Sequence, residues 1–252
     1  MARTKTGIRG LDKALTGGIP EGNIVLLSGG AGTGKSTFCL QFLVNGAKMF
    51  GEKGLYISTE QDEIELQRHA EGFRWDLMDL QKKNLLKVVY FDIMQGDDIL
   101  AKALEAIKIF KPKRIAIDSL TTMTDALIIG GLSQRSSFSL VQVAENVSPI
   151  PRTEQIVSKS ILYKLVAELK RYNTTTLLTS ELPEDARALS SDGVSEFIAD
   201  GVIILRYFEI GIADYRSMFV RKMRYSAYEK DILPYNITEE GITITEGDKF
   251  KA

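Results

Sequence analysis

The sequence predicts an α/β fold: a mostly parallel, twisted sheet with helices on both faces and an antiparallel edge toward the C-terminus. Short apolar runs alternate with longer amphipathic segments, which is the pattern of a parallel sheet whose strands are joined by helices. At the end of one apolar run, residues 29–36 read GGAGTGKS. Near the C-terminus, strand-like runs follow one another through short links, which indicates the antiparallel edge.

Each expected element has its own local pattern. Strands are expected where β-branched and aliphatic residues cluster, and helices where apolar residues recur at helical spacing. The expected strands are 24–27, 55–59, 86–91, 114–118, 174–179, 201–207, 217–221 and 241–245, and the expected helices are about 37–43, 62–72, 97–110 and 156–172. Two stretches without a clear pattern, about 122–155 and 181–195, are expected to be variable connections.

The composition is that of one globular domain spanning residues 1–252. Hydrophobic residues make up 44% and charged residues 26% of the 252 positions, and no apolar run is long enough to cross a bilayer. The N-terminus lacks the apolar core of a signal peptide, and Cys39 has no second cysteine to pair with, so we expect a cytoplasmic protein and no membrane association. The net charge of -1 means that any nucleic-acid contact must depend on a local basic patch.

The GGAGTGKS stretch has the spacing G-x-x-x-x-G-K-[ST] between an expected strand and an expected helix, which predicts a P-loop. Its glycines let the backbone approach a polyphosphate such as that of ATP. We expect the side chain of Lys35 to reach the β and γ phosphates, where it takes part in catalysis, and Ser36 to bind Mg²⁺. A flexible Gly-rich loop is the alternative. The predicted nucleotide-binding residues are Gly29, Gly30, Ala31, Gly32, Thr33, Gly34, Lys35, Ser36 and Thr37.

Two acids follow expected strands. Asp118 is the expected second ligand of Mg²⁺, and the alternative is that it caps the next helix. If the strand before Glu60 lies beside the P-loop strand, the carboxylate of Glu60 faces the γ-phosphate and can orient a water molecule for attack. The alternative for Glu60 is a solvated or helix-capping acid, and the local sequence does not decide between the two.

His69 is the single histidine of the chain. It falls in a polar helix with no cysteine or further histidine at ligand spacing, so we expect a surface side chain and no zinc site.

Several motifs in their order along the chain resemble the RecA superfamily, and within it the KaiC-like and archaeal RadA-paralogue ATPases. They are TGIRGLD at 6–12, GGIPEG at 17–22, the P-loop, STE at 58–60, the strand ending in Asp118, ADGVI at 199–203 and KMR at 222–224. The resemblance implies a RecA-like P-loop NTPase core. It also implies that Glu60 is the catalytic glutamate, and that Lys222 and Arg224 are fingers that reach the nucleotide of a neighbouring subunit in a homo-oligomer, which is a hexameric ring in the family.

Three departures from the family patterns limit what is expected. Glu60 is followed by Gln61 where many KaiC-like chains have a second acid, so hydrolysis is expected to be slow. After Arg224 the chain lacks the glycine and histidine of the usual finger loop, so the finger loop is expected in a different position. Ser180 and Glu181 stand where recombinases carry a glutamine that senses the γ-phosphate, which weakens the expected coupling of ATP to DNA.

The two variable stretches stand where RecA-like proteins place loops that bind single-stranded DNA. The first contains Arg135 and Arg152, which are the candidate DNA contacts, although a partner-binding loop is equally compatible with its composition. The second contains four acids and a single Arg187, so it favours a regulatory or partner-binding loop.

The leading hypothesis is therefore an ATP-binding, slowly hydrolysing accessory or regulatory protein of DNA recombination or repair that contacts single-stranded DNA or a recombinase. No segment typical of filament-forming recombinases precedes the core, so strand exchange itself is not expected. One alternative is a KaiC-like, nucleotide-gated signalling or scaffold ATPase that acts on a protein partner. A small-molecule kinase is a further alternative, disfavoured because no lid segment is evident.

Overall fold

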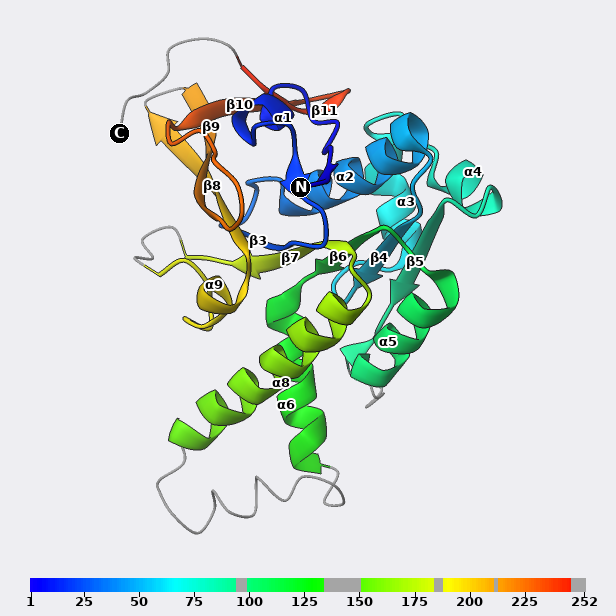
Figure 1. Cartoon of the computed structure of the whole chain (residues 1–252), viewed down its shortest axis with the longest axis vertical. Coiled ribbons are helices and arrows are strands. Elements are labelled where there is room, and N and C mark those ends of the chain that lie inside the picture. Colours follow the sequence, from blue (N-terminus) through cyan, green and yellow to red (C-terminus); the bar gives the residue numbers. More distant parts are fainter. Residues whose placement is uncertain (94–98, 134–150, 184–187, 211–212, 246–252) are drawn as a thin grey trace.

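In the described part of the chain, a nine-stranded sheet runs through the molecule (Figure 1). The structure is a computed structural model that describes residues 1–93, 99–133, 151–183, 188–210 and 213–245. Six neighbouring strands, β8, β3, β7, β6, β4 and β5, pair in parallel. The other three, β9, β10 and β11, pair antiparallel at one edge of the sheet. This confirms the predicted α/β fold with its antiparallel edge. In sheet order the strands are β11 (Gly241–Ile244), β10 (Leu233–Thr238), β9 (Ala213–Met223), β8 (Gly201–Ile210), β3 (Ile24–Gly29), β7 (Thr175–Glu181), β6 (Arg114–Asp118), β4 (Gly54–Ser58) and β5 (Leu86–Tyr90).

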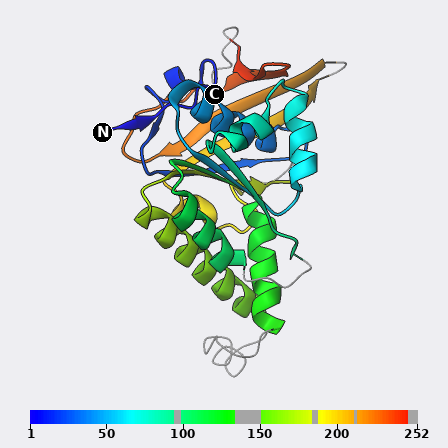
Figure 2. The same cartoon turned by 90° about the vertical axis from the view of Figure 1, so that its right-hand side faces the viewer.

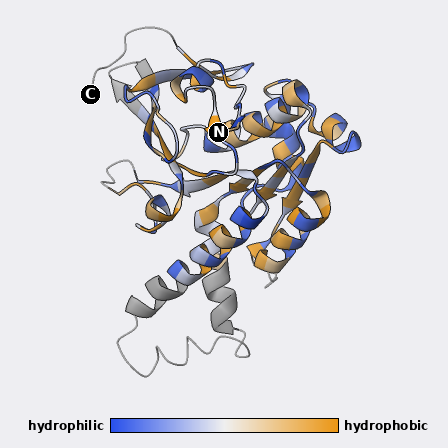
Figure 3. Ribbon diagram, viewed as in Figure 1, coloured by the Kyte–Doolittle hydropathy of each residue, from blue (hydrophilic) through white to orange (hydrophobic). Residues whose placement is uncertain are grey.

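Helices cover both faces of the sheet, because successive residues of each strand point to opposite sides. In β3, Val25 and Leu27 join the core on one face, and Ile24 and Leu26 join the core on the other. Figure 3 shows the hydrophobic strands between the helices. Helices α2 (Lys35–Phe50), α3 (Glu63–Glu71) and α4 (Leu77–Lys82) lie on the first face, and α5 (Ile99–Phe110), α6 (Leu120–Ser133) and α8 (Pro151–Arg171) lie on the second.

Helices α6 and α8 lie side by side and extend away from the sheet (Figures 1 and 2). This corrects the expectation that 122–155 is a variable connection, since its first part continues α6 and its last part begins α8. The local sequence of α6 is rich in threonine and includes two adjacent glycines, which are poor helix formers. Packing of buried Leu120 and Met123 against the sheet stabilises the helix instead. No helix within the described ranges combines the length and apolarity that crossing a membrane requires.

The order of the strands shows that the condition stated above for Glu60 is not met. Strand β4, which precedes Glu60, does not lie beside β3, because β7 and β6 lie between them. The order of strands in a sheet depends on how the crossover helices pack, which local sequence patterns do not report. The strands are nevertheless parallel, so the end of β4 and the P-loop lie at the same edge of the sheet.

Several elements were not expected from the sequence, and two of them show why. Helix α4 is a short helix whose cap, Asp76, accepts the backbone N–H of Asp79 at 2.8 Å. Strand β10 pairs with both β9 and β11 although it contains Pro234. A proline weakens the local pattern of a strand, so the sequence alone did not predict β10.

The N-terminal segment folds around Asp12. It contains short strands β1 (Arg3–Thr4) and β2 (Ile19–Pro20) and helix α1 (Leu11–Ala14). One carboxylate oxygen of Asp12 accepts the backbone N–H and the hydroxyl of Thr6 at 2.7 and 2.8 Å, and the other accepts the N–H of Gly7 at 3.1 Å. A Cβ on Gly7 would lie 2.8 Å from the Cβ of Asn45 in α2. These residues of the TGIRGLD motif therefore fix the N-terminal segment to the P-loop helix.

Candidate nucleotide site

The P-loop connects the end of β3 with the start of α2. Gly32 and Gly34 have φ angles of 70° and 87°, in the left-handed region that favours glycine. A Cβ on Gly34 would lie 2.6 Å from Cδ1 of Ile237, so the hairpin of β10 and β11 packs closely against this loop. The loop thus brings the backbone N–H groups at the start of a 16-residue helix to the carboxyl edge of the sheet.

Positive charge gathers at this loop. The ammonium group of Lys35 donates to the carbonyls of Gly29 and Gly30 at 2.9 and 3.0 Å. Arg216 of β9 donates from Nε to the carbonyl of Gly32 at 3.2 Å, and its guanidinium lies 4.8 Å from the ring centre of Tyr207. The first turn of α2 contains no acid. This arrangement suits a polyanion. Sequence analysis missed Arg216 because it is 184 residues from Gly32 along the chain.

Asp118 ends β6 and is 3% exposed. The hydroxyl of Tyr56 donates to one carboxylate oxygen at 2.6 Å, and the hydroxyl of Thr179 donates to the other at 2.6 Å. Burial and the adjacent Asp118 charge raise the pKa of Tyr56 well above its usual value, so it stays a neutral donor. Ser36 lies close enough to the same Tyr56 hydroxyl to oppose this rise in pKa in part. The hydroxyl of Tyr56 therefore lies between the two expected ligands of Mg²⁺.

Glu60 lies directly after β4 at the same edge. Its side chain is exposed, and Oε1 accepts the hydroxyl of Thr122 at 3.3 Å. The cap of α3 is Asp62, and the cap interaction at the first turn of α6 is made by the Ser119 hydroxyl, which accepts a backbone N–H at 3.1 Å. Both capping alternatives, for Glu60 and for Asp118, are therefore wrong. The role of Glu60 in orienting water stays a prediction.

Tyr56 and Thr179 were not selected by the sequence analysis. Both have inward-facing hydroxyls in buried strands, and both are completely buried. The available signal was chemical: a polar group in a strand of otherwise aliphatic residues needs a buried partner. The identity of that partner, Asp118 on β6, depended on the strand order.

His69 also lies differently from the expectation. It is half-buried rather than on the surface, and Nε2 lies 3.0 Å from the hydroxyl oxygen of Thr37, the last predicted nucleotide-binding residue. Helix α3 brings it there by packing on α2. The expectation failed because His69 borders the buried face of α3, formed by Leu66 and Ala70, which packs into the same core as α2.

The predicted sensor residues lie beside the P-loop strand. Strand β7 pairs in parallel with β3, so that Ser180 lies opposite Ser28 and Glu181 opposite Gly29. The Ser180 hydroxyl accepts the backbone N–H of Ser191 at 3.1 Å, whereas Glu181 is exposed. Their position suits a sensor, and the sensing role stays a prediction.

Lys222 and Arg224 lie at the opposite edge of the sheet, where β8 begins and β9 ends. The ammonium group of Lys222 donates to the carbonyls of Glu196 and Ala199 at 3.0 and 2.6 Å, around the short helix α9 (Ser195–Ile198). Arg224 pairs with buried Asp200 at 3.4 Å. Neither side chain faces the P-loop of its own chain, so any contact with nucleotide requires a neighbouring subunit.

The candidate DNA contacts are not placed by the structure. Arg135 lies outside the described residues, and Arg152 belongs to α8 but its side chain lies outside them. In the second stretch, Asp192 accepts the hydroxyl of Ser190 and the backbone N–H groups of Val194 and Ser195, each at 2.8 Å. This acid therefore holds the start of α9, while Glu184, Asp185 and Arg187 lie outside the described residues.

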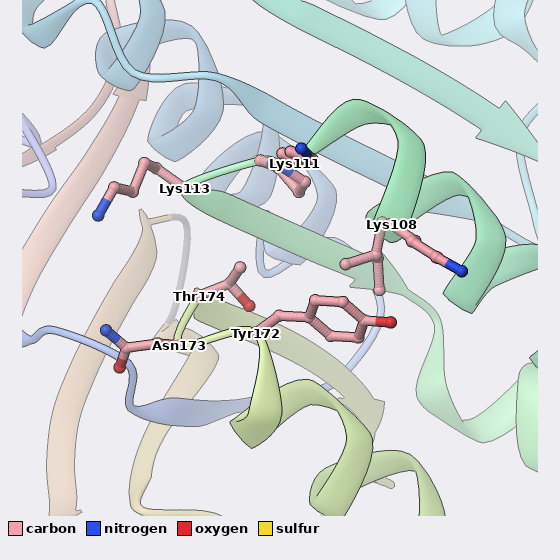
Figure 4. A pocket seen from close by; sticks show the side chains of 8 residues that line it. Lys108, Lys111, Lys113, Tyr172, Asn173 and Thr174 are labelled. Atoms are coloured by element: carbon pink, nitrogen blue, oxygen red, sulfur yellow. The ribbon is translucent and has the colours of Figure 1, made fainter.

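A cavity of about 410 Å³ lies at the amino edge of β6 and β7, away from the P-loop (Figure 4). It lies at the C-terminal ends of α5 and α8, at the opposite edge of the sheet from the P-loop, and Lys108 and Lys111 are among its lining residues. Lys113 is paired with Glu21 at 2.9 Å. The cavity is therefore not part of the nucleotide site. Its polar lining consists of Lys108, Lys111, Lys113, Tyr172, Asn173 and Thr174.

Comparison with known proteins agrees with this geometry. The family model described as "ATPase: KaiC" matches residues 4–130 and 139–249. The circadian clock oscillator protein KaiC of Synechococcus elongatus is 30% identical over 97% of this chain, but the chain spans only 44% of that protein. A UPF0273 protein of Methanopyrus kandleri is 33% identical, with 96% of this chain and 91% of the relative covered. The solved structure of a KaiC-like protein of Pyrococcus horikoshii has a TM-score of 0.78 at 32% identity, covering 97% of this chain and 99% of that one.

Proposed function

We propose, from the premise that this chain belongs to the KaiC family of ATPases, that it binds ATP with Mg²⁺ at the P-loop and hydrolyses it slowly. The observation that carries the proposal is Asp118. It is a buried carboxylate held only by hydroxyl groups, and among the described residues no lysine or arginine pairs with it. A buried charge without a counter-charge is costly.

The donor set around Asp118 fits Mg²⁺. A carboxylate and the nearby hydroxyl of Ser36 are the hard oxygen ligands that Mg²⁺ prefers, and a bound cation would compensate the buried charge. When bound, Mg²⁺ neutralises charge on the phosphates. Tyr56 and Thr179 would keep the carboxylate in one orientation, as outer ligands do in metal sites.

The remaining residues of the site have complementary tasks. Lys35 and the N-terminus of α2 bind the phosphates, and Arg216 adds positive charge at the loop. Glu60 orients a water molecule for attack on the γ-phosphate. Because Glu60 is followed by Gln61 and not by a second acid, a single carboxylate does this work and turnover is slow.

We extend the proposal to a homo-oligomer in which Lys222 and Arg224 reach the nucleotide of a neighbouring copy. The support is their position at the far edge of the sheet, from which neither can serve its own P-loop. A basic group supplied by a neighbouring subunit stabilises the charge that develops during phosphoryl transfer.

The nucleotide state is proposed to be read by a protein partner. A role in DNA recombination or repair, with single-stranded DNA or a recombinase as partner, stays a prediction that neither the described residues nor the relatives support. It is tested by binding of a fluorescent single-stranded oligonucleotide across a salt series with MgATP present. Binding that falls steeply with salt would support the role in DNA recombination or repair, because contacts with the phosphates of DNA release counterions.

Turnover of ATP by the wild-type chain and by Glu60→Gln tests the ATPase proposal. We expect MgATP-dependent phosphate release by wild type and a loss of roughly 100-fold or more in Glu60→Gln with ATP still bound. Lys48→Ala is the matched control, since Lys48 is an exposed lysine in the last turn of the same helix α2. Equal turnover by wild type and Glu60→Gln would show that Glu60 does not orient the water.

A further inference from the structure

The side chain of His69 bridges two parts of the nucleotide site that are distant in the sequence. On one side, Nε2 lies 3.0 Å from the hydroxyl oxygen of Thr37 at the start of the P-loop helix. On the other, Nδ1 lies 3.5 Å from Oε1 of Gln61, the neighbour of Glu60. One ring of α3 therefore touches both the phosphate-binding helix and the segment that holds the expected catalytic carboxylate.

The two contacts fit a neutral ring that is protonated at Nδ1. In this form Nδ1 donates to the amide oxygen of Gln61, which only accepts, and Nε2 accepts the hydroxyl proton of Thr37. Burial lowers the pKa of His69, although the charge of Asp118 acts in the opposite direction, and the ring is therefore neutral at neutral pH.

The surroundings hold the ring in place. Phe73, in the turn that follows α3, lies with its ring centre 5.6 Å from that of His69, and Trp75 stacks on Phe73 at 4.8 Å. Asp62 and Glu65 form a capping box that fixes the first turn of α3, directly after Gln61. A fixed imidazole between a fixed helix start and the P-loop helix transmits small movements rather than absorbing them.

We propose that His69 is a positioning residue that couples the P-loop helix to Glu60 through Gln61. The inference rests on the proposed ATPase function and names the residue that sets the geometry of its hydrolytic step. His69 does not touch the substrate. It keeps the segment with Glu60 at a set distance from Thr37, so that binding of the phosphates at α2 also orients the carboxylate that prepares the water.

The test separates positioning from packing through kcat and KM. In His69→Ala we expect kcat to fall by about 10-fold, as is common when an outer hydrogen-bonding partner is lost, while KM for MgATP stays within about 2-fold. Asn places an amide near the position of Nδ1 and Gln places one near Nε2, so His69→Asn and His69→Gln each keep one contact and should each restore only part of kcat. Arg68→Ala is the control, because Arg68 is the exposed neighbour on the same helix.

A double-mutant cycle with Gln61→Ala completes the test. If His69 acts through Gln61, the double variant is no slower than the slower single variant. The inference would be overturned if the losses of kcat in the two single variants multiplied in the double variant, or if kcat were unchanged in His69→Ala. Full recovery of kcat in both amide variants at equal melting temperature would also overturn it. If wild type hydrolyses ATP and His69→Ala does so equally, this inference alone fails, whereas absence of turnover in wild type overturns the ATPase proposal and this inference with it.

Discussion

The two ends of the parallel strands hold buried acids in different ways. At the carboxyl edge, Asp118 is 3% exposed, and the hydrogen bonds that its side chain accepts from described residues come from the neutral hydroxyls of Tyr56 and Thr179. At the amino edge, Asp200 is 1% exposed and pairs with Lys170 at 3.0 Å and Arg224 at 3.4 Å. Both carboxylates are almost completely buried, but in the part of the chain that the structure describes only Asp200 is paired with cationic side chains.

The difference separates a binding group from a structural one. Asp200 also accepts the backbone N–H of Ile24 at 3.1 Å, so it ties the start of β3 to the start of β8. Its charge is neutralised within the fold. The charge of Asp118 is not, which leaves it ready for a cation from outside the chain. The comparison predicts that substitutions at the carboxyl edge change nucleotide chemistry, whereas those at the amino edge change stability.

The largest expected contrast is between two lysines. Lys35→Ala should weaken MgATP binding by roughly 10- to 100-fold, because a charge-assisted contact to phosphate is lost. Lys170→Ala should leave binding unchanged and lower the free energy of unfolding by about 1 kcal/mol, since Lys170 itself is 43% exposed. Calorimetric titration and denaturant unfolding measure the two effects. Weaker MgATP binding in Lys170→Ala would break the comparison.

Next in size is Tyr56→Phe, which keeps the ring and removes the hydroxyl between Ser36 and Asp118. We expect turnover to fall by about 10-fold and the Mg²⁺ concentration for half-maximal turnover to rise, because the carboxylate loses its fixed orientation. A Mg²⁺ titration of the hydrolysis rate provides the measurement. An unchanged Mg²⁺ requirement would mean that Tyr56 only fills space.

A smaller effect is expected for Arg224→Ala in assemblies mixed with wild type. If Arg224 serves a neighbouring subunit, turnover should fall several-fold below the value for simple dilution of active subunits. Lys170→Ala is a matched control, since both residues pair with Asp200 and both are 43% exposed. Equal losses in both mixtures would assign Arg224 to the amino-edge ion pair alone.

The smallest effect concerns Asp192, which, like Asp118, accepts hydrogen bonds from neutral donors. Burial alone would raise its pKa, but hydrogen bonds from Ser195, Val194 and Ser190 outweigh burial and hold the pKa below its usual value. Its contribution to stability is therefore full above about pH 4 and is lost as the pH falls through the lowered pKa. Asp192→Asn should destabilise by at most about 1 kcal/mol at pH 7 and by less at pH 3. Denaturant unfolding at both pH values measures the effect. An equal loss of unfolding free energy at pH 7 and at pH 3 would contradict this prediction.

Much of the fold was predictable because its signals are local. The P-loop, the strand before Asp118 and the antiparallel edge all depend on patterns within a few residues. Helix α6 escaped prediction because its stability comes from packing and not from propensity. The site was predictable only where a motif carried it, so Lys35, Ser36 and Asp118 were named in advance. Tyr56, Arg216 and His69 were not placed at this site from the sequence, because their partners lie 62, 184 and 32 residues away and meet them only through the sheet order and helix packing.

The central claim is that Asp118 is an uncompensated carboxylate for Mg²⁺, and ATP binding with and without Mg²⁺ tests it most directly. The measurement compares wild type with Asp118→Asn and Asp200→Asn. We predict that Mg²⁺ tightens ATP binding in wild type and in Asp200→Asn, that this tightening is absent in Asp118→Asn, and that only Asp200→Asn loses stability, by about 1–2 kcal/mol. Undiminished tightening by Mg²⁺ in Asp118→Asn would contradict the account.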